Sequence, residues 1–132
     1  MEQINLKTYK SNQFLNITSE VEQIIKKEGL DSGICYLFVP HTTAAVTINE
    51  NADPDVILDL LTGLAETFPD LKEYRHLEGN SSAHLKSSLI GCSLDIPINK
   101  SRLCLGKWQG IYFCEFDGPR ERKIFIQLIK TI

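Results

Sequence analysis

Three segments of the sequence would be apolar on both faces if they formed β-strands. The clearest is 33–40, which carries Ile34, Tyr36 and Phe38 on one face and Cys35, Leu37 and Val39 on the other. The segments 108–116 and 122–130 show the same pattern. A strand that is apolar on both faces must be covered on both faces. The chain is therefore constrained to a layered arrangement in which sheets are buried from two sides.

Shorter strands are predicted at 2–9, 13–17, 42–48, 93–98 and 101–105, where apolar or β-branched residues are bounded by turn residues. Ser11 and Asn12 interrupt the first two of these strands, and they are expected to form a hairpin turn.

Three short helices are expected between the strands. The first begins at Ser19, with Glu22 completing a capping box, and ends at Gly29. The second begins after Asp53, its expected N-cap, and fades near Thr67; its apolar stripe is Val56, Ile57, Leu60, Leu61 and Leu64. The third covers 82–90, after a cap at Asn80 or Ser81, and stops at Gly91. Three short helices cannot cover every apolar sheet face, so subunit contacts are expected as well.

Composition narrows the class of protein. A chain of 132 residues that is 42% hydrophobic forms one domain with its own core. Fourteen basic and seventeen acidic residues give a net charge of −3, so we expect neither nucleic acid nor an anionic membrane as a partner. No apolar run approaches the roughly 20 residues of a membrane span, and no signal peptide opens the chain. We expect a cytoplasmic protein, in which the basic cluster 120–123 is a solvated entry to a strand.

The three histidines are the first candidates for chemistry. His41 follows the 33–40 strand, His76 lies in a polar loop, and His84 falls in the first turn of the third helix. Three imidazoles that leave one coordination position open are typical of a catalytic zinc site. The spacing of eight between His76 and His84 matches no standard motif, so the residues alone leave ordinary structural histidines as an alternative.

Acidic and amide side chains supply the candidate catalytic groups. Asp53 has a sufficient structural task as a helix cap, whereas Glu50 and Glu78 have none. Either glutamate could act as a general base or bind a hard cation together with a phosphate. Asn80 leads into the third helix, whose free N–H groups suit an anion. We therefore name Glu78, Glu50 and Asn80 as candidate catalytic residues.

Two cations and one aromatic residue are candidates for substrate binding. Lys86 lies one turn into the third helix, and Arg120 follows the tight turn expected at Gly118-Pro119. Both suit a phosphate, although a solvated arginine on a hairpin is the plainer alternative for Arg120. Trp108, the only tryptophan, could pack in the core or stack on a flat heterocycle.

Five ordered motifs give the chain a specific resemblance. They are Val39-Pro40-His41-Thr42-Thr43-Ala44-Ala45, Asn49 to Val56, Glu78-Gly79-Asn80-Ser81, Ala83-His84-Leu85-Lys86, and Leu105 to Arg120 with Trp108-Gln109-Gly110 and Asp117-Gly118-Pro119-Arg120. From about residue 33 to the end, the sequence resembles the YjbQ-like family, whose members are named secondary thiamine-phosphate synthases.

The resemblance implies a small α+β domain, with mostly antiparallel β-sheets packed as a sandwich, assembled as a homotrimer. It also implies a pocket in which His41, His76 and His84 bind a divalent metal. Zinc is the first candidate, with magnesium as an alternative for a diphosphate substrate. The substrate is expected to be a phosphorylated small molecule, and the matched motifs add Asn49 and Gln109 to the candidate substrate-binding residues.

The implied reaction joins a pyrimidine diphosphate to a thiazole phosphate and releases pyrophosphate. Such a step needs cations on the leaving diphosphate and a flat sheltered pocket for the pyrimidine. Lys107 and Ser101 depart from the expected family pattern, in which threonine and glycine stand at these positions. The sequence leaves two alternatives open: a metal- or phosphometabolite-binding protein without turnover, and a metal-dependent hydrolase.

Overall fold

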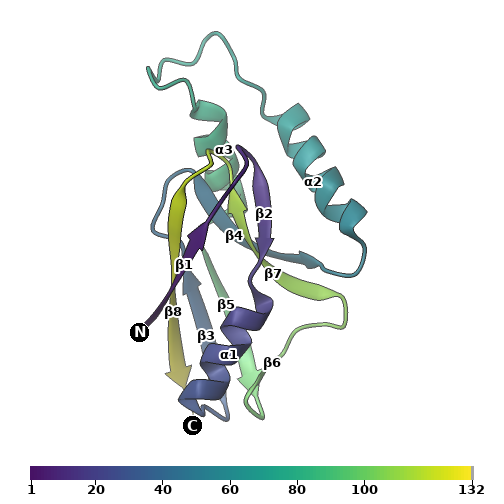
Figure 1. Ribbon diagram of the computed structural model, residues 1–132, viewed down its shortest axis with the longest axis vertical. Coiled ribbons are helices and arrows are strands. Elements are labelled where there is room, and N and C mark those ends of the chain that lie inside the picture. The colour runs from purple at the N-terminus through teal and green to yellow at the C-terminus, as the bar shows by residue number, and fades with distance from the viewer. Residues whose placement is uncertain (132) are drawn as a thin grey trace.

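Two antiparallel sheets face each other across the hydrophobic core in the computed structural model, which describes residues 1–131 (Figure 1). The larger sheet has the strand order β1 (Glu2–Lys7), β8 (Glu121–Lys130), β3 (Gly33–Phe38), β5 (Ser93–Asn99) and β6 (Arg102–Leu103). The smaller sheet has the order β2 (Gln13–Asn16), β7 (Gln109–Glu115) and β4 (Ala44–Glu50). With three helices, this is the expected single α+β domain built on antiparallel sheets.

The core fills the space between the two sheets. The larger sheet contributes Cys35, Leu37, Ile96, Ile124 and Ile126, and the smaller one contributes Ala44, Val46, Ile111 and Phe113. Helix α1 (Thr18–Glu28) adds Val21 and Ile25 to the same cluster. One face of each apolar strand is therefore buried between the sheets, as its alternation predicts.

The predicted hairpin between the first two strands is wrong. Strand β1 pairs with β8, and β2 pairs with β7, so the chain crosses from one sheet to the other at Ser11 and Asn12. The Gly118 N–H donates to the Ser11 carbonyl oxygen, and the Thr8 N–H donates to the Arg120 carbonyl oxygen. These long-range bonds fix the crossing. The dipeptide Ser11-Asn12 is equally compatible with a hairpin turn and with a crossing between sheets, so the sequence alone does not separate the two.

The predicted capping box of α1 is also wrong. The helix begins at Thr18, after Ile17, and the side chain of Asn16 accepts hydrogen bonds from the Thr18 N–H (3.0 Å) and hydroxyl (2.6 Å). The Thr18 hydroxyl oxygen in turn accepts from the Ile111 N–H of β7 (2.8 Å). This tertiary contact fixes the start of the helix one residue before Ser19. The predicted end is confirmed, because Gly29 adopts a left-handed conformation.

Helices α2 (Pro54–Thr67) and α3 (Ser81–Ile90) lie over the outer face of the smaller sheet. The predicted cap of α2 is confirmed, since the Asp53 carboxylate accepts from the Asp55 N–H at 2.9 Å. Yet α2 buries none of its residues, and even its apolar stripe stays half-exposed. Leu58 is 59% exposed. In Figure 1, α2 leans away from the sheet, so its apolar side chains are only partly covered by this chain.

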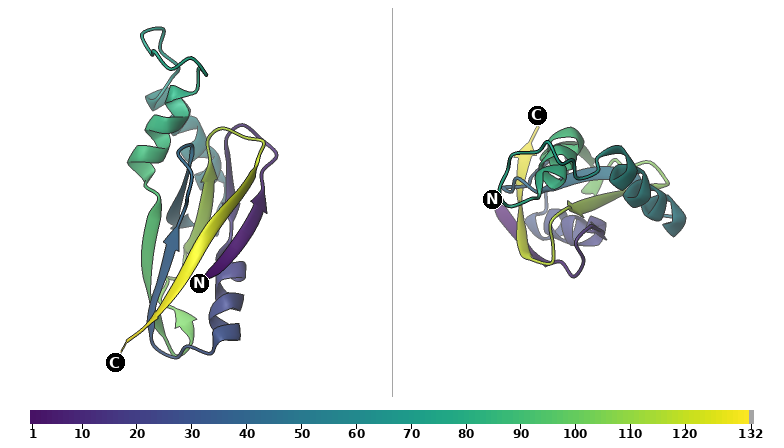
Figure 2. Two further views of the ribbon diagram at one scale, coloured as in Figure 1. Left: turned by 90° about the vertical axis from the view of Figure 1, so that its left-hand side faces the viewer. Right: turned by 90° about the horizontal axis from the view of Figure 1, so that it is seen from above.

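The outer face of the larger sheet is uncovered as well. Figure 2 (left) shows this face with no helix lying over it. Its central strands carry Ile34, Tyr36, Phe38, Phe125 and Ile129, all half-buried or exposed in the single chain. Within residues 1–131, no helix is both long and apolar enough to span a bilayer. The three helices thus leave two apolar surfaces open, as the sequence predicts.

Candidate functional site

One cavity of about 670 Å³ opens where β3 ends, β8 begins and α3 begins. Its walls include six of the predicted site residues: His41, His76, Glu78, Asn80, His84 and Arg120. Phe38, Val39, Pro40, Thr42, Thr43, Cys92 and Arg122 complete the lining. Segments that are far apart in the sequence therefore bring all three histidines of the chain to one place. We call this space the histidine cavity.

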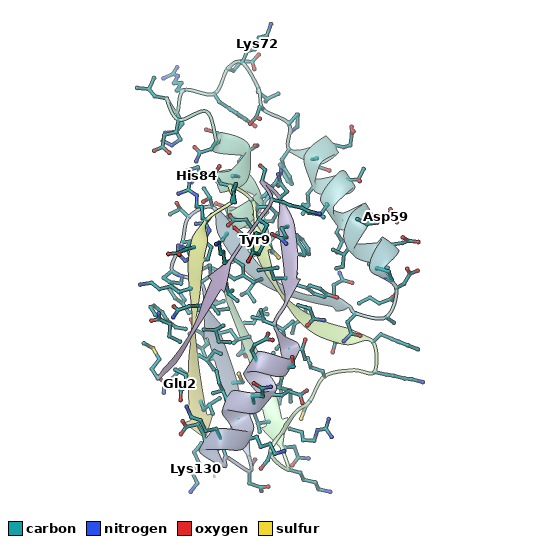
Figure 3. All side chains as sticks on the ribbon, viewed as in Figure 1. Glu2, Tyr9, Asp59, Lys72, His84 and Lys130 are labelled. Atoms are coloured by element: carbon teal, nitrogen blue, oxygen red, sulfur yellow. The ribbon has the colours of Figure 1, made fainter. Side chains whose placement is uncertain are left out.

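His76 and His84 lie next to each other. His84 projects from the first turn of α3, and His76 lies in the loop that joins α2 to α3, whose far tip carries Lys72 (Figure 3). The two ring centroids are 5.3 Å apart and the rings are inclined at 81°. The Nε2 atom of His76 is 3.8 Å from Oε1 of Glu78. Both rings and this carboxylate line the histidine cavity.

His41 is held differently from the other two histidines. Its Nε2 atom accepts a hydrogen bond from the Lys123 N–H of β8 at 3.1 Å. Burial lowers the pKa of His41 below its ordinary value, and the nearby Arg122 guanidinium lowers it further. The imidazole is therefore neutral at neutral pH, with its proton on Nδ1 while Nε2 accepts this bond.

The donor set fits a divalent metal only in part. Within residues 1–131, no three His, Cys, Asp or Glu side chains form a preformed metal site. His76 and His84 provide two neighbouring imidazoles on one wall of the cavity. His41 has the right chemistry, but it would have to bind through Nδ1 or release the Lys123 N–H. A third ligand from His41 would therefore require a rearrangement of that side chain or its bonding.

Arg122 is a member of this cavity that the sequence prediction missed. The cluster 120–123 is not a uniformly solvated strand entry, because the Arg122 side chain is only 4% exposed and pairs with the fully buried Glu115. Its Nε atom donates to Glu115 Oε1 (2.8 Å), and its Nη2 atom donates to Glu115 Oε2 and to the Thr43 hydroxyl (2.8 Å). The period of two could have revealed it, since Arg122 shares the inward face of β8 with Ile124 and Ile126.

Glu115 lies at the centre of this buried network. Besides Arg122, the Thr8 hydroxyl donates to Oε1 (2.7 Å) and the Asp117 N–H donates to Oε2 (3.0 Å). Burial raises the pKa of Glu115, but the hydrogen bonds from Arg122, Thr8 and Asp117 outweigh burial and hold the pKa below its ordinary value. Glu115 is therefore ionised at neutral pH, and it fixes the Arg122 guanidinium from behind.

Arg120 is fixed by a second carboxylate. Its Nε and Nη2 atoms donate to the carbonyl oxygen and the Oδ2 atom of Asp117, both at 2.7 Å. Asn80 donates to the same Oδ2 at 2.8 Å. The hairpin alternative is wrong, because the segment before Arg120 is a bend that carries the chain from β7 in the smaller sheet to β8 in the larger one. A Cβ on Gly118 would lie 2.3 Å from the Lys10 carbonyl oxygen, so only glycine allows this close approach. Asp117 thereby links the start of α3 to Arg120.

Lys86 lies outside the histidine cavity. It is only 5% exposed, and its Nζ atom donates to Asn12 Oδ1 at 3.1 Å. It lines a neighbouring cavity of about 450 Å³ together with Asp70 and Asp117. Burial lowers the pKa of Lys86, while the charge of Asp70 opposes this shift. The two cations predicted to share one phosphate, Lys86 and Arg120, therefore line different cavities.

Four further predicted residues gather at the opposite end of the smaller sheet. Glu50 pairs with Gln109 in the β4–β7 ladder, beside Asn49 and Trp108. Strand β4 begins near the histidine cavity at Ala44 and ends at Glu50. The six residue steps between them correspond to roughly 20 Å along a strand. Trp108 is 55% exposed and lies outside the core. Within one chain these residues form a separate cluster, which we call the β4–β7 end cluster.

Comparison with known proteins identifies the family. The family model described as UPF0047 protein YjbQ-like matches residues 2–131. UPF0047 protein YugU of Bacillus subtilis is 49% identical over 127 residues, which cover 96% of each chain. The chain belongs to the YjbQ-like UPF0047 family. UPF0047 protein MJ1081 of Methanocaldococcus jannaschii is 47% identical over 124 residues, which cover 94% of this chain and 90% of that protein.

Solved structures of YjbQ-like proteins share the whole fold. An uncharacterised YjbQ/UPF0047 protein from Clostridium acetobutylicum is 50% identical and superposes with a TM-score of 0.95, covering 98% of this chain and 100% of its own. A YbjQ-like protein of unknown function from Sulfolobus solfataricus is 34% identical, with a TM-score of 0.94 and coverages of 98% and 96%. The two sheets and three helices described above therefore belong to the UPF0047 fold.

Proposed function

We propose that this UPF0047 protein is a small metal-dependent enzyme that acts on a phosphorylated small molecule in the histidine cavity. The observation that carries the proposal is the convergence of three histidines, one carboxylate and two arginines on one cavity. A cavity of about 670 Å³ is in the range of metabolite-binding sites. Neutral imidazoles suit a transition metal such as zinc, and guanidinium groups suit phosphate oxygens.

The residues around the cavity divide into three roles. His76 and His84 would hold the metal, with His41 as the third ligand; zinc is the first candidate and magnesium the alternative. A bound metal supplies positive charge against developing negative charge on a phosphate. Glu78 lies at the cavity wall beside His76 and is the candidate acid or base. Arg120 and Asn80, both held by Asp117, are placed to orient the substrate.

The reaction we propose is thiamine-phosphate synthesis as a secondary activity. A ring nitrogen of the thiazole phosphate forms a bond to the methylene carbon of the pyrimidine diphosphate, and the bond from that carbon to the diphosphate oxygen breaks. Pyrophosphate leaves with the bonding electrons, so cations near the diphosphate favour the step. The resemblance to proteins named as secondary thiamine-phosphate synthases supports this choice of substrates, and the charges of the cavity are compatible with it.

A turnover experiment separates this proposal from its two alternatives. The metal-loaded protein should release pyrophosphate and form thiamine phosphate in equal amounts from the two phosphorylated precursors. His84→Ala should lose both products, because it removes an imidazole from the proposed metal site. Phosphate or pyrophosphate released without thiamine phosphate would point to a metal-dependent hydrolase. Binding of both precursors without any product would contradict an enzyme and favour a metabolite-binding protein.

We also propose that the protein is a homotrimer. The half-exposed stripe of α2 and the open outer face of the larger sheet are two apolar surfaces that a single chain leaves uncovered. Large apolar patches of this kind mark subunit interfaces. A neighbouring subunit is also the simplest way for the β4–β7 end cluster to reach a histidine cavity, because within one chain the two are separated by roughly the length of β4.

Light scattering tests the assembly. At micromolar concentration the particle mass should be about three times the chain mass of 14.9 kDa. A monomer would show that the exposed apolar surfaces of α2 and β3 are tolerated in water, and a dimer would contradict the threefold arrangement.

A further inference from the structure

We propose that Arg120 and Arg122 form an oxyanion-binding clamp on the wall of the histidine cavity and that the clamp takes the phosphate or diphosphate group of the ligand. The inference deepens the proposed function, on which it rests for the choice of a phosphorylated ligand. Both arginines line the cavity, and they stand two residues apart at the entry to β8. In an extended chain, residues two apart point to the same side, with Cα atoms about 6.5–7 Å apart.

The guanidinium of Arg122 keeps one of its amino groups free. Its Nε and Nη2 atoms are engaged by Glu115 and Thr43, whereas Nη1 makes no hydrogen bond to any residue in the described part of the chain. Nη1 is not fully buried, so this unpaired atom reaches open space. The open space that Arg122 lines is the histidine cavity. The two N–H groups of Nη1 are therefore the ones that we infer to be available to a ligand in that cavity.

Arg120 repeats the same arrangement. Asp117 engages its Nε and Nη2 atoms, and within residues 1–131 no acceptor engages Nη1. Each guanidinium is therefore held from behind by a carboxylate, with the opposite amino group free. Because the side chains are already ordered, little further conformational entropy is lost when an anion binds. Arg122 is nearly buried and the Arg120 side chain is 48% exposed, yet a carboxylate orients both guanidinium groups.

The free N–H donors of the two arginines favour an oxyanion. Two guanidinium groups face one carboxylate, that of Glu78, which is 69% exposed and well solvated. Glu115 and Asp117 balance the charge of the arginines, so recognition relies on directed N–H donors more than on net charge. Donors of this kind match the several oxygens of a phosphate or pyrophosphate better than the two oxygens of a simple carboxylate. The expected ligand is therefore a phosphorylated one.

Calorimetry on metal-free protein tests the clamp without relying on metal or turnover. Chelator-treated protein should bind inorganic pyrophosphate more tightly than acetate. Arg120→Gln should weaken pyrophosphate binding about ten- to a hundredfold, the usual loss for one charge-assisted contact. Arg102→Gln is the matched control, because Arg102 is exposed and lines a different cavity beside Glu22 and Lys26. Its affinity should equal that of the wild type.

A conservative variant addresses Arg122, whose removal would endanger folding. Arg122→Lys keeps a positive charge beside Glu115 but loses the second amino group of the fork. We expect a folded protein, verified by its thermal unfolding, that binds pyrophosphate at least about ten times more weakly. If Arg122→Lys does not fold, Arg120→Gln alone decides the question.

Three outcomes would overturn the clamp. One is the absence of pyrophosphate binding to the wild type at millimolar concentration. Another is an unchanged affinity in Arg120→Gln. The third is a weaker affinity in Lys86→Ala together with an unchanged affinity in both arginine variants, which would place the anion in the neighbouring cavity. Metal retention and product formation are measured separately, so a failure of the clamp can be distinguished from a failure of the proposed function.

Discussion

Replacing Arg122 by methionine should lower the free energy of unfolding by about 3–5 kcal/mol, the usual cost of removing one partner of a buried ion pair. The variant leaves the Glu115 carboxylate, fully buried in the wild type, without the guanidinium that donates to both of its oxygens. The Thr8 hydroxyl and the Asp117 N–H remain as donors, but they carry no charge. Urea unfolding at neutral pH measures the loss.

The pH dependence of the same variant gives a second test. In the wild type, the pKa of Glu115 lies below its ordinary value of 4.5. The ionised carboxylate therefore contributes stability that is fully present above about pH 4.5 and is lost as the pH falls through the lower, folded-state pKa. In Arg122→Met, burial without a counter-charge should raise the pKa of Glu115. Protonation then removes the unpaired buried charge and with it part of the loss in stability. The difference in stability between the two proteins should therefore shrink in acid.

Two control variants show whether the pair itself is responsible. Glu115→Gln combined with Arg122→Met removes both charges and should recover much of the loss, because a buried pair replaced as a unit is often nearly neutral in stability. Arg102→Met removes an exposed arginine and should change stability by less than about 0.5 kcal/mol. A loss below about 1 kcal/mol in Arg122→Met would mean that solvent reaches Glu115 and that the network is not truly buried.

The apolar alternation of the sequence predicted most elements, because local patterns decide strands and helices. The start of α2 follows from Asp53, which caps it, and from Pro54, which occupies its first position. Strand pairing was not predictable in the same way. The partner of β1 is β8, at the other end of the chain, and nothing near Ser11 and Asn12 indicates that choice. The start of α1 failed for the same reason, since Ile111 fixes Thr18 from another element.

The candidate site shows the same division between local and distant information. Each of the three histidines stands at an element boundary, which predicts that they converge, and all of them line one cavity. Lys86 was placed with them although it stands two residues after His84. Residues two apart on a helix point to nearly opposite sides, so the helical period already argued against this placement. The run of charged residues at 120–123 conceals the strand alternation that points Arg122 inward.

The β4–β7 end cluster marks what a single chain could not reveal. Glu50 and Trp108 belong to motifs on which the resemblance to the family rests, yet the length of β4, roughly 20 Å, separates their end of the sheet from the histidine cavity. A motif shows which residues belong together in a family but not whether they act within one chain or between chains. The distance between these residues and the histidine cavity follows only from the arrangement of the sheets.

The protein purified without chelator should retain about one zinc ion per chain, and replacing any one histidine by alanine should weaken that retention at least about a hundredfold. Loss of a supporting residue around a metal typically costs 10–100-fold, and loss of a direct ligand should cost no less. His76→Ala and His84→Ala remove the two imidazoles that already stand together, with ring centroids 5.3 Å apart. Elemental analysis and competition with a chelator measure the retention.

His41→Ala is the decisive member of this series, because its Nε2 atom is engaged by the Lys123 N–H. If the metal draws His41 out of this bond, or binds its Nδ1 atom, the variant should lose zinc as fully as the other two. Cys92→Ser is the matched control, since the Cys92 thiol lines the same cavity and is a competing ligand. Zinc kept in His41→Ala but lost in Cys92→Ser would make the thiol the third ligand. Stoichiometric zinc in all three histidine variants would exclude the histidine cavity as the metal site, because two remaining imidazoles rarely hold zinc tightly.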